Sequence, residues 1–100
     1  EQKISTLSDG RLLVVCWSFD ENANANRRNR YAISDDHGRT FMPPCETPLN
    51  GETCGVVGLD GNKVLCVYRR CDDKPGLWGH LAMRWPMTGG FEATLGRCPA

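Results

Sequence analysis

The chain lacks an excess of either charge and lacks any long apolar run. Its 12 lysines and arginines balance 12 aspartates and glutamates, so the formal net charge at pH 7 is zero. A chain without net charge has no long-range field that draws it to nucleic acid or to an anionic membrane. No apolar run approaches the roughly 18 residues of a transmembrane helix. We therefore expect no nucleic-acid partner and no membrane span.

The chain is also poor in histidine and has no Cys-x-x-Cys pair. Only His37 and His80 could join its six cysteines in a metal site, and the cysteine spacing is not that of a zinc site. We expect no metal and no cofactor. Cys16 and Cys66 lie in apolar segments, where a reduced cysteine behaves as a small hydrophobic residue. The even number of cysteines permits disulfides, but the spacing selects no pairing.

Two further absences concern targeting and helices. The first residues do not resemble a signal peptide, and the cellular compartment stays open. Apolar residues nowhere recur with the 3.6-residue spacing of an amphipathic helix. Instead, Leu12–Phe19 is apolar at nearly every position, which is typical of a strand covered on both faces. We therefore predict an all-β chain.

What the chain does contain is an internal repeat. The hairpin-turn dipeptides Asp9-Gly10 and Asp60-Gly61 lie 51 residues apart (60 − 9 = 51). Each is followed by an apolar strand that ends in an aromatic residue, as expected for a hairpin. A period near 50 with several short strands per repeat is typical of β-propellers.

Each repeat divides into four strands. In the first repeat, the predicted strands are residues 3–8, 11–19, 30–34 and 40–42. In the second repeat, the predicted strands are residues 53–59, 63–69, 77–84 and 91–95. Pro43-Pro44 is expected to end the outermost strand of the first repeat. Two such blades, at about 3–43 and 53–96, cannot close a ring, because closed propellers have about 4–8 blades.

The most specific motif is a turn of eight residues, Ser34-Asp35-Asp36-His37-Gly38-Arg39-Thr40-Phe41. The Asp36 carboxylate can accept hydrogen bonds from backbone N–H groups that follow it. Gly38 can take a conformation that a Cβ would penalise. Ser34 and Thr40 bracket the turn with hydroxyls, and Phe41 is expected to fill an apolar gap. An ordinary hairpin turn is the alternative interpretation.

This motif resembles the Asp-box of sialidase-like (exo-α-sialidase, BNR-repeat) β-propellers. The segments that carry the resemblance are residues 30–41 and 64–70, the second reading Val-Leu-Cys-Val-Tyr-Arg-Arg. The resemblance implies that residues 1–100 form two antiparallel four-stranded blades of an incomplete, six-bladed propeller, whose other blades are partners. Residues 84–90 occupy the place of a second Asp-box but have lost its Ser, Asp and Thr. The Asp-box itself is a structural turn and implies no catalysis.

The resemblance also implies a function, an exo-glycosidase that removes terminal sialic acid or a related acidic sugar from glycans. Such a site needs arginines for the sugar carboxylate, an acid/base carboxylate and a tyrosine nucleophile. The family's Arg-Ile-Pro motif is absent. Tyr31 and Tyr68 lack the surroundings of the nucleophile, which is therefore expected outside this chain. The alternative is a non-catalytic Asp-box propeller that binds glycan or protein, because fold does not determine function.

Strand direction places the candidate residues at one end of the blades. The loops at 19–29, 44–52 and 69–76 are expected on one face, and the Asp-box on the opposite face. On the first face, the resemblance implies an acid/base role for Asp20. It implies substrate-binding roles for Arg30, Glu52, Arg69 and Arg70. The simpler alternatives are a turn-forming aspartate for Asp20 and a polar loop residue for Glu52. For Arg69 and Arg70 they are a solvated strand end or a salt bridge between blades.

Overall fold

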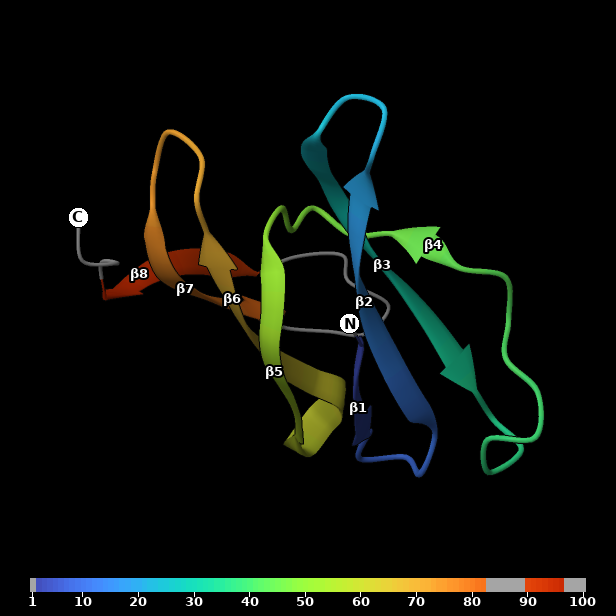
Figure 1. Ribbon diagram of the computed structural model, residues 1–100. Coiled ribbons are helices and arrows are strands. Elements are labelled where there is room, and N and C mark those ends of the chain that lie inside the picture. Colours follow the sequence, from blue (N-terminus) through green and yellow to red (C-terminus); the bar gives the residue numbers. More distant parts are fainter. Residues whose placement is uncertain (1, 83–89, 97–100) are drawn as a thin grey trace.

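The computed structural model describes residues 2–82 and 90–96, and nearly all of its regular structure is β-strand (Figure 1). The first sheet contains β1 (Gln2–Thr6), β2 (Leu12–Asp20), β3 (Ala25–Ser34) and β4 (Cys45–Glu46). The second sheet contains β5 (Glu52–Leu59), β6 (Lys63–Arg70), β7 (Gly76–Ala82) and β8 (Phe91–Gly96). Strands follow chain order in each sheet, and neighbours are antiparallel. The prediction of two four-stranded antiparallel sheets is confirmed.

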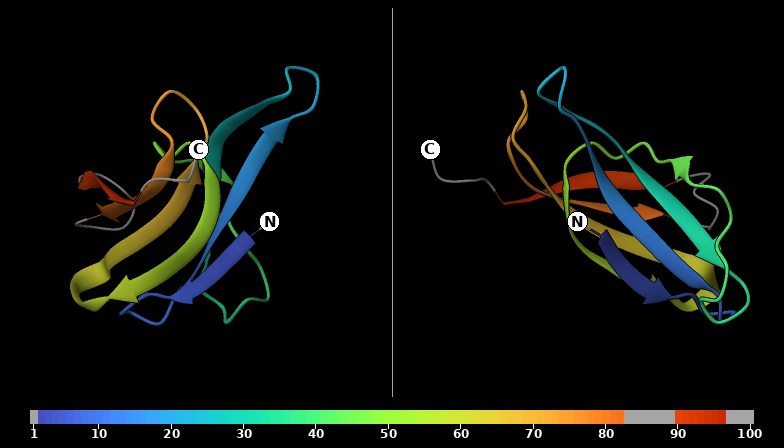
Figure 2. Two further views of the ribbon diagram at one scale, coloured as in Figure 1. Left: turned by 60° about the vertical axis from the view of Figure 1, so that its left-hand side comes forward. Right: turned by 45° about the vertical axis from the view of Figure 1, so that its right-hand side comes forward.

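The first strands of the two sheets lie side by side. Figure 1 and Figure 2 show that β1 and β5 run in the same direction and that the sheets extend from them to opposite sides. The backbone N–H of Gly58 on β5 donates to Oγ of Ser5 on β1 at 3.0 Å. A Cβ at position 58 would overlap the carbonyl group of Thr6. Glycine therefore permits the close approach of these two strands.

The hydrophobic core lies where the two sheets face each other. Leu13 of β2 and Val64 of β6 are fully buried in it. The other buried apolar side chains are Leu7, Val15, Ile33, Leu49, Val56, Cys66, Tyr68 and Ala82. Successive side chains of a strand point to opposite faces, so each sheet has an inner face, in this core, and an outer face.

The outer face of β2 differs from the expectation that this strand is covered on both sides. Leu12 and Val14 point to the outer face and are only half-buried. The described residues form two sheets, and two sheets share a single apolar interface. Each sheet therefore has only one face covered by the other.

The described cysteines are all unpaired. Cys45, Cys54 and Cys71 are exposed, whereas Cys66 lies in the core. Burial raises the pKa of the Cys66 thiol to about 12, which keeps it neutral and makes it a small hydrophobic residue. The expectation of reduced, structural cysteines holds for this residue.

The outermost strand of the first sheet is shifted from its predicted place. It consists of Cys45–Glu46, not residues 40–42, and follows the two prolines. The backbone N–H of Thr40 donates to the Asp36 side chain, and the prolines have no N–H to donate to β3. Within the predicted strand, the backbone N–H of Met42 does donate to the carbonyl of Ile33 on β3 at 3.0 Å. The strand itself begins after the prolines, at Cys45, which lies opposite Tyr31.

β3 is longer than predicted because the loop before it is short. It begins at Ala25 rather than at Arg30, and Ala25 lies opposite Asp20. The Asp20 carboxylate accepts hydrogen bonds from the backbone N–H groups of Asn22 and Ala23 at 3.0 and 3.2 Å. This tight turn converts most of the loop predicted at 19–29 into strand.

The hairpins relate the two sheets by 52 residues rather than 51. The backbone N–H of Leu7 donates to the carbonyl of Arg11 at 2.8 Å, and Leu59 lies opposite Lys63 in the second sheet. Both differences, 59 − 7 and 63 − 11, equal 52. The Asp-Gly dipeptide fills the last two positions of the first three-residue turn but the first two positions of the second. An alignment on those dipeptides therefore misses the structural equivalence by one residue.

Part of the second repeat lies outside the described residues. β7 is described to Ala82 and β8 from Phe91, so the altered turn predicted at 84–90 falls almost entirely in the undescribed part. The continuation of the third strand to Arg84 falls there too. Within residues 2–82 and 90–96, no helix has the length and apolar composition needed to span a membrane.

Candidate functional site

The turn at Ser34–Phe41 has the hydrogen bonds expected of its sequence. The Asp36 carboxylate accepts from Oγ of Ser34 at 2.7 Å, from the backbone N–H of Thr40 at 2.9 Å, and from the Thr40 hydroxyl. These bonds, chiefly those from Thr40, lower the pKa of Asp36 from 3.8 to about 2. Gly38 has a φ of +89°, and its N–H donates to Oγ of Ser34 at 2.8 Å. The turn is held by its own side chains.

Phe41 does not fill an apolar gap as predicted. Its side chain is 42% exposed, and it borders a shallow concavity with Ile4 and Val14 on the outer face of the first sheet. Ile4 is itself 59% exposed. Among the described residues, no second layer of side chains covers this face and encloses the Phe41 ring.

The loops are sorted onto two ends of the molecule as predicted. Figure 1 shows the β2–β3 hairpin, the β6–β7 hairpin and the β4–β5 connection at one end. The turn at Ser34–Phe41 lies at the other end, with the β1–β2 and β5–β6 turns. This follows from the alternation of strand direction in each antiparallel sheet.

A cleft of about 400 Å³ lies between the two hairpins at the first of these ends. Its lining residues are Phe19, Asn24, Ala25, Asn26, Asn50, Cys71 and Asp72. Three asparagine amides bring both donors and acceptors to the cleft. Phe19, which is 43% exposed, contributes an aromatic ring. We call this the inter-hairpin cleft.

Asp20 is the last residue of β2, where the turn to β3 begins. Besides its two backbone hydrogen bonds, its carboxylate accepts from the Arg27 guanidinium at 2.7 Å. The hydrogen bond from Arg27, followed by the one from the backbone of Ala23, lowers the pKa of Asp20. The carboxylate is therefore ionised near neutral pH and closes the turn. Its proposed acid/base role stays a prediction.

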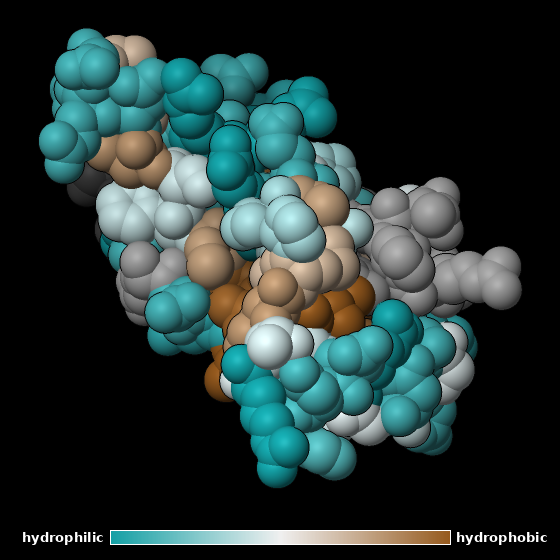
Figure 3. All heavy atoms as spheres, turned by 90° about the vertical axis from the view of Figure 1, so that its right-hand side faces the viewer, coloured by the Kyte–Doolittle hydropathy of each residue, from teal (hydrophilic) through white to brown (hydrophobic). Residues whose placement is uncertain are grey.

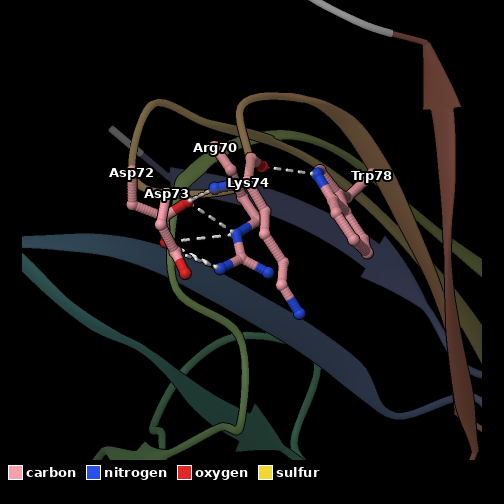
Figure 4. Close-up of polar contacts among 5 residues, drawn as sticks. All are labelled: Arg70, Asp72, Asp73, Lys74 and Trp78. Carbon is pink, nitrogen blue, oxygen red and sulfur yellow. Dashed lines mark hydrogen bonds and ion pairs between the residues drawn. The ribbon is translucent and has the colours of Figure 1, made fainter.

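Arg70 anchors the β6–β7 hairpin (Figure 4). Its Nε and Nη2 donate to the two carboxylate oxygens of Asp72 at 3.1 and 2.7 Å, and Nη2 lies 3.5 Å from Asp73. The guanidinium carbon lies 4.9 Å from the ring centroid of Trp78. Nε1 of that indole donates to the carbonyl of Lys74 at 2.9 Å. The hydrogen bonds from Arg70 are the main cause of the lowered pKa of Asp72.

Arg69 and Arg70 do not converge on one point, because consecutive strand residues point to opposite faces. Arg69 lies across from Glu52 of β5 in the sheet and forms an ion pair with it. The Arg69 side chain is 51% exposed and that of Glu52 is 33% exposed. Arg70 instead lies on the Trp78 side of the sheet and is 18% exposed.

Arg30 is separated from these residues. It lies within β3, opposite Cys16 of β2 and Glu46 of β4, and it is not among the residues that line the inter-hairpin cleft. The predicted substrate-binding residues are therefore divided between three places: β3, the Arg69–Glu52 pair and the Arg70–Asp72 pair. Of these predicted residues, the structure brings together only Arg69 and Glu52, which form an ion pair.

The asparagines that line the cleft, Asn24, Asn26 and Asn50, are the site residues that sequence reasoning missed. Four asparagines occur within residues 22–29. Asn29 is fully buried and connects the sheets: its Nδ2 donates to Oγ1 of Thr53 at 3.0 Å, and its backbone N–H donates to the carbonyl of Leu49 at 2.7 Å. This connection holds the segment before β5, and with it Asn50, beside the β2–β3 hairpin. The high density of asparagine in residues 22–29 is the feature of the sequence from which this site could have been predicted.

Comparisons of the chain with protein-family models, with curated proteins and with solved structures find no match. Within the described residues, no three His, Cys, Asp or Glu side chains are grouped so that they could hold a metal ion. Any inference about function therefore rests on the geometry of the inter-hairpin cleft and of the ion pairs around it.

Proposed function

We propose that this chain is a non-catalytic glycan-binding module whose site is the inter-hairpin cleft. One observation carries the proposal: asparagine amides, a half-exposed phenyl ring and an ionised carboxylate meet in one concavity. Sugars offer hydroxyl groups that both donate and accept hydrogen bonds, and amides match both roles. They also offer C–H faces that pack on aromatic rings.

The components of the cleft are held in place before a ligand arrives. Asp72 is fixed by two hydrogen bonds from Arg70, and Oδ1 of Asn26 accepts from Nε1 of Trp17 at 2.8 Å. A preorganised site loses less conformational entropy on binding. The volume of about 400 Å³ is near the lower end of small-ligand sites, which span about 300–1,000 Å³. It suits the end of a glycan rather than a long segment.

The carboxylates near the cleft suit the binding of a glycan, because an ionised carboxylate only accepts hydrogen bonds and sugar hydroxyls can donate them. The pKa values of Asp20 and Asp72 are both lowered by arginine partners. Of the two, Asp72 lines the cleft and is therefore placed to accept hydrogen bonds from sugar hydroxyls.

We also propose that the two sheets are two blades of a sialidase-like, six-bladed β-propeller. The support is the parallel, adjacent placement of β1 and β5, the four-stranded antiparallel order of each sheet, and the repeat of 52 residues between the hairpins. The Asp-box-like turn at the far end agrees with this arrangement.

The experiment for the binding proposal is a glycan-array screen of the 100-residue chain, followed by calorimetric titration of the best ligand. Phe19→Ala and Asn50→Ala are each expected to weaken binding about tenfold, which corresponds to about 1.4 kcal/mol. Asn22→Ala is the matched control, because Asn22 lies in the same hairpin but does not line the cleft. Absence of any glycan ligand, or wild-type affinity in both cleft variants, rejects the proposal.

A second candidate is hydrolysis of terminal sialic acid or a related acidic sugar. The observation that favours it is the Arg69–Glu52 pair, in which a half-exposed guanidinium meets a carboxylate on the first strand of the second sheet. A sugar carboxylate could take the place of Glu52, because arginine binds carboxylates through paired hydrogen bonds. The nucleophile and further arginines would come from other blades.

Hydrolysis is tested on the longest protein that contains this chain, with a fluorogenic sialoside between pH 4 and 8. We expect Arg69→Ala to abolish turnover if this candidate is correct, whereas Arg70→Ala should mainly reduce stability. A folded protein that shows no turnover anywhere in this range eliminates hydrolysis and leaves the binding proposal intact.

A further inference from the structure

Trp17 contacts two of the residues that line the inter-hairpin cleft but does not line it itself. Its ring centroid lies 5.7 Å from that of Phe19, and the two rings are tilted by 47°. Its Nε1 donates to Oδ1 of Asn26 at 2.8 Å. Phe19 and Asn26 lie opposite each other on β2 and β3. One indole therefore supports an aromatic ring and an amide that are cross-strand neighbours.

The hydrogen bond from Trp17 fixes the orientation of the Asn26 amide. An indole N–H can only donate, so the amide must turn its oxygen, and not its nitrogen, toward Trp17. Among the described residues, Nδ2 of Asn26 has no partner. Because Asn26 lines the cleft, this nitrogen is the group that it keeps for a ligand. A ligand must therefore bring an acceptor to this side of the cleft.

The Phe19 ring supplies an apolar surface beside this donor. Figure 3 shows apolar side chains gathered in the middle of one side of the molecule, between polar ends, and the β2–β3 hairpin is at one of the ends (Figure 1). Phe19 is nevertheless 43% exposed there. Residues directly opposite each other in antiparallel strands have Cβ atoms about 4.5–5.5 Å apart. A ligand group that joins an acceptor oxygen to a small apolar group can therefore contact Asn26 and Phe19 at once.

The charges around the cleft disfavour an acidic ligand group. Asp72 brings a carboxylate to the cleft, whereas none of the described residues that line it is a lysine or an arginine. The nearby Arg70 is already engaged by Asp72 and Asp73. A ligand carboxylate would thus meet a like charge and no free cation. A ligand hydroxyl, in contrast, can donate to Asp72.

We propose that the cleft selects a neutral, N-acetylated sugar and that Trp17 is a positioning residue for this selection. The proposal rests on the proposed binding of glycans and names the class of sugar. The acetamido carbonyl accepts from Nδ2 of Asn26, the acetamido methyl packs on Phe19, and a ring hydroxyl donates to Asp72. An acetamido group carries its acceptor oxygen and its methyl on one carbon atom, which matches the neighbouring donor and ring.

The experiment is calorimetric titration of the 100-residue chain with N,N′-diacetylchitobiose and with cellobiose, which has hydroxyls in place of both acetamido groups. We expect the wild type to bind the acetylated disaccharide about tenfold more tightly, as the gain of one hydrogen bond provides. A glycan that ends in sialic acid carries an acetamido group and a carboxylate. It should bind more weakly than the neutral acetylated disaccharide.

Two variants test the orientation of the amide. Trp17→Phe keeps an aromatic ring beside Phe19 but has no N–H to hold Asn26. Asn26→Asp keeps an acceptor for Trp17 and replaces the donor by a second carboxylate oxygen. Each should remove most of the preference for the acetylated disaccharide, with a smaller effect on the affinity for cellobiose. Circular dichroism checks that both variants are folded.

The matched control is Asn22→Asp, which adds the same charge in the same hairpin outside the cleft and should retain the wild-type preference. Equal affinity for the two disaccharides overturns the selection, as does the wild-type preference in both folded variants or tighter binding of the sialylated glycan. Binding of neither disaccharide, when the glycan array has identified another ligand, overturns it too but leaves the binding proposal intact. A chain that binds no glycan on the array rejects the binding proposal as well.

Discussion

Arg70 holds the carboxylate of Asp72 through two hydrogen bonds, of 3.1 and 2.7 Å, while its guanidinium carbon lies 4.9 Å from the centroid of the Trp78 ring. The arginine thus joins the β6–β7 loop to the strand that comes after it. Because Asp72 lines the inter-hairpin cleft, this contact links the stability of the loop to the shape of the site.

Arg70→Ala is expected to destabilise the chain by about 1 kcal/mol, which is the sum that a bidentate ion pair and a cation–π contact provide in a partly exposed position. Arg69→Ala is the matched control, because the neighbouring arginine is half-exposed and its ion pair should contribute less than about 0.5 kcal/mol. Urea unfolding measures both. Equal losses would show that the Trp78 contact contributes nothing.

Asp36 should make the chain sensitive to acid. Its pKa is lowered from 3.8 to about 2 in the folded state, so its stabilising effect is complete above about pH 4 and is lost as the pH falls toward 2. Asp36→Asn should lower the melting temperature at pH 6 and flatten its decline between pH 4 and 2. Asp35→Asn removes the same charge beside it and should retain the wild-type decline. A parallel decline in all three proteins would contradict this prediction.

Gly58 should tolerate no side chain. Gly58→Ala places a Cβ against the Thr6 carbonyl and should destabilise the chain by about 2 kcal/mol, since β1 and β5 must separate to admit it. Gly55→Ala lies in the same strand, where a Cβ meets open space, and should change the stability by less than about 1 kcal/mol. Similar urea midpoints for both variants would show that the strands are not in close contact at Gly58.

Asn29 and Thr53 should be energetically coupled. Asn29→Ala removes the hydrogen bond between Nδ2 and Oγ1 of Thr53, and leaving the buried hydroxyl of Thr53 without this donor should cost about 1–3 kcal/mol. Thr53→Val removes the other partner. A double-mutant cycle in urea measures the coupling, which should reach at least about 0.5 kcal/mol for a direct contact. Additive losses would show that the bond does not hold the two sheets together.

Local chemistry accounts for what could be predicted. The Asp-Gly turns, the apolar run at Leu12–Phe19 and the hydroxyl and carboxylate groups around Asp36 are local signals, and strands and turns formed where they predicted them. The strand at Cys45 and the tight turn closed by Asp20 were not predicted. Both depend on which backbone N–H and carbonyl groups remain free to pair after a neighbouring turn has formed. The opposite directions of Arg69 and Arg70 follow from strand alternation and could have been predicted.

The amino-acid sequence by itself determined the all-β class, the two four-stranded sheets and the order of their strands, since these depend on hydrophobic pattern and turn residues close together in the chain. Only the tertiary structure decided the one-residue change in the repeat, the joining of the sheets through Asn29 and the meeting of Phe19, Asn50 and Asp72 in one cleft. The physical reason is that these features depend on contacts between residues far apart in the chain, whose geometry is set by how β1 and β5 pack together.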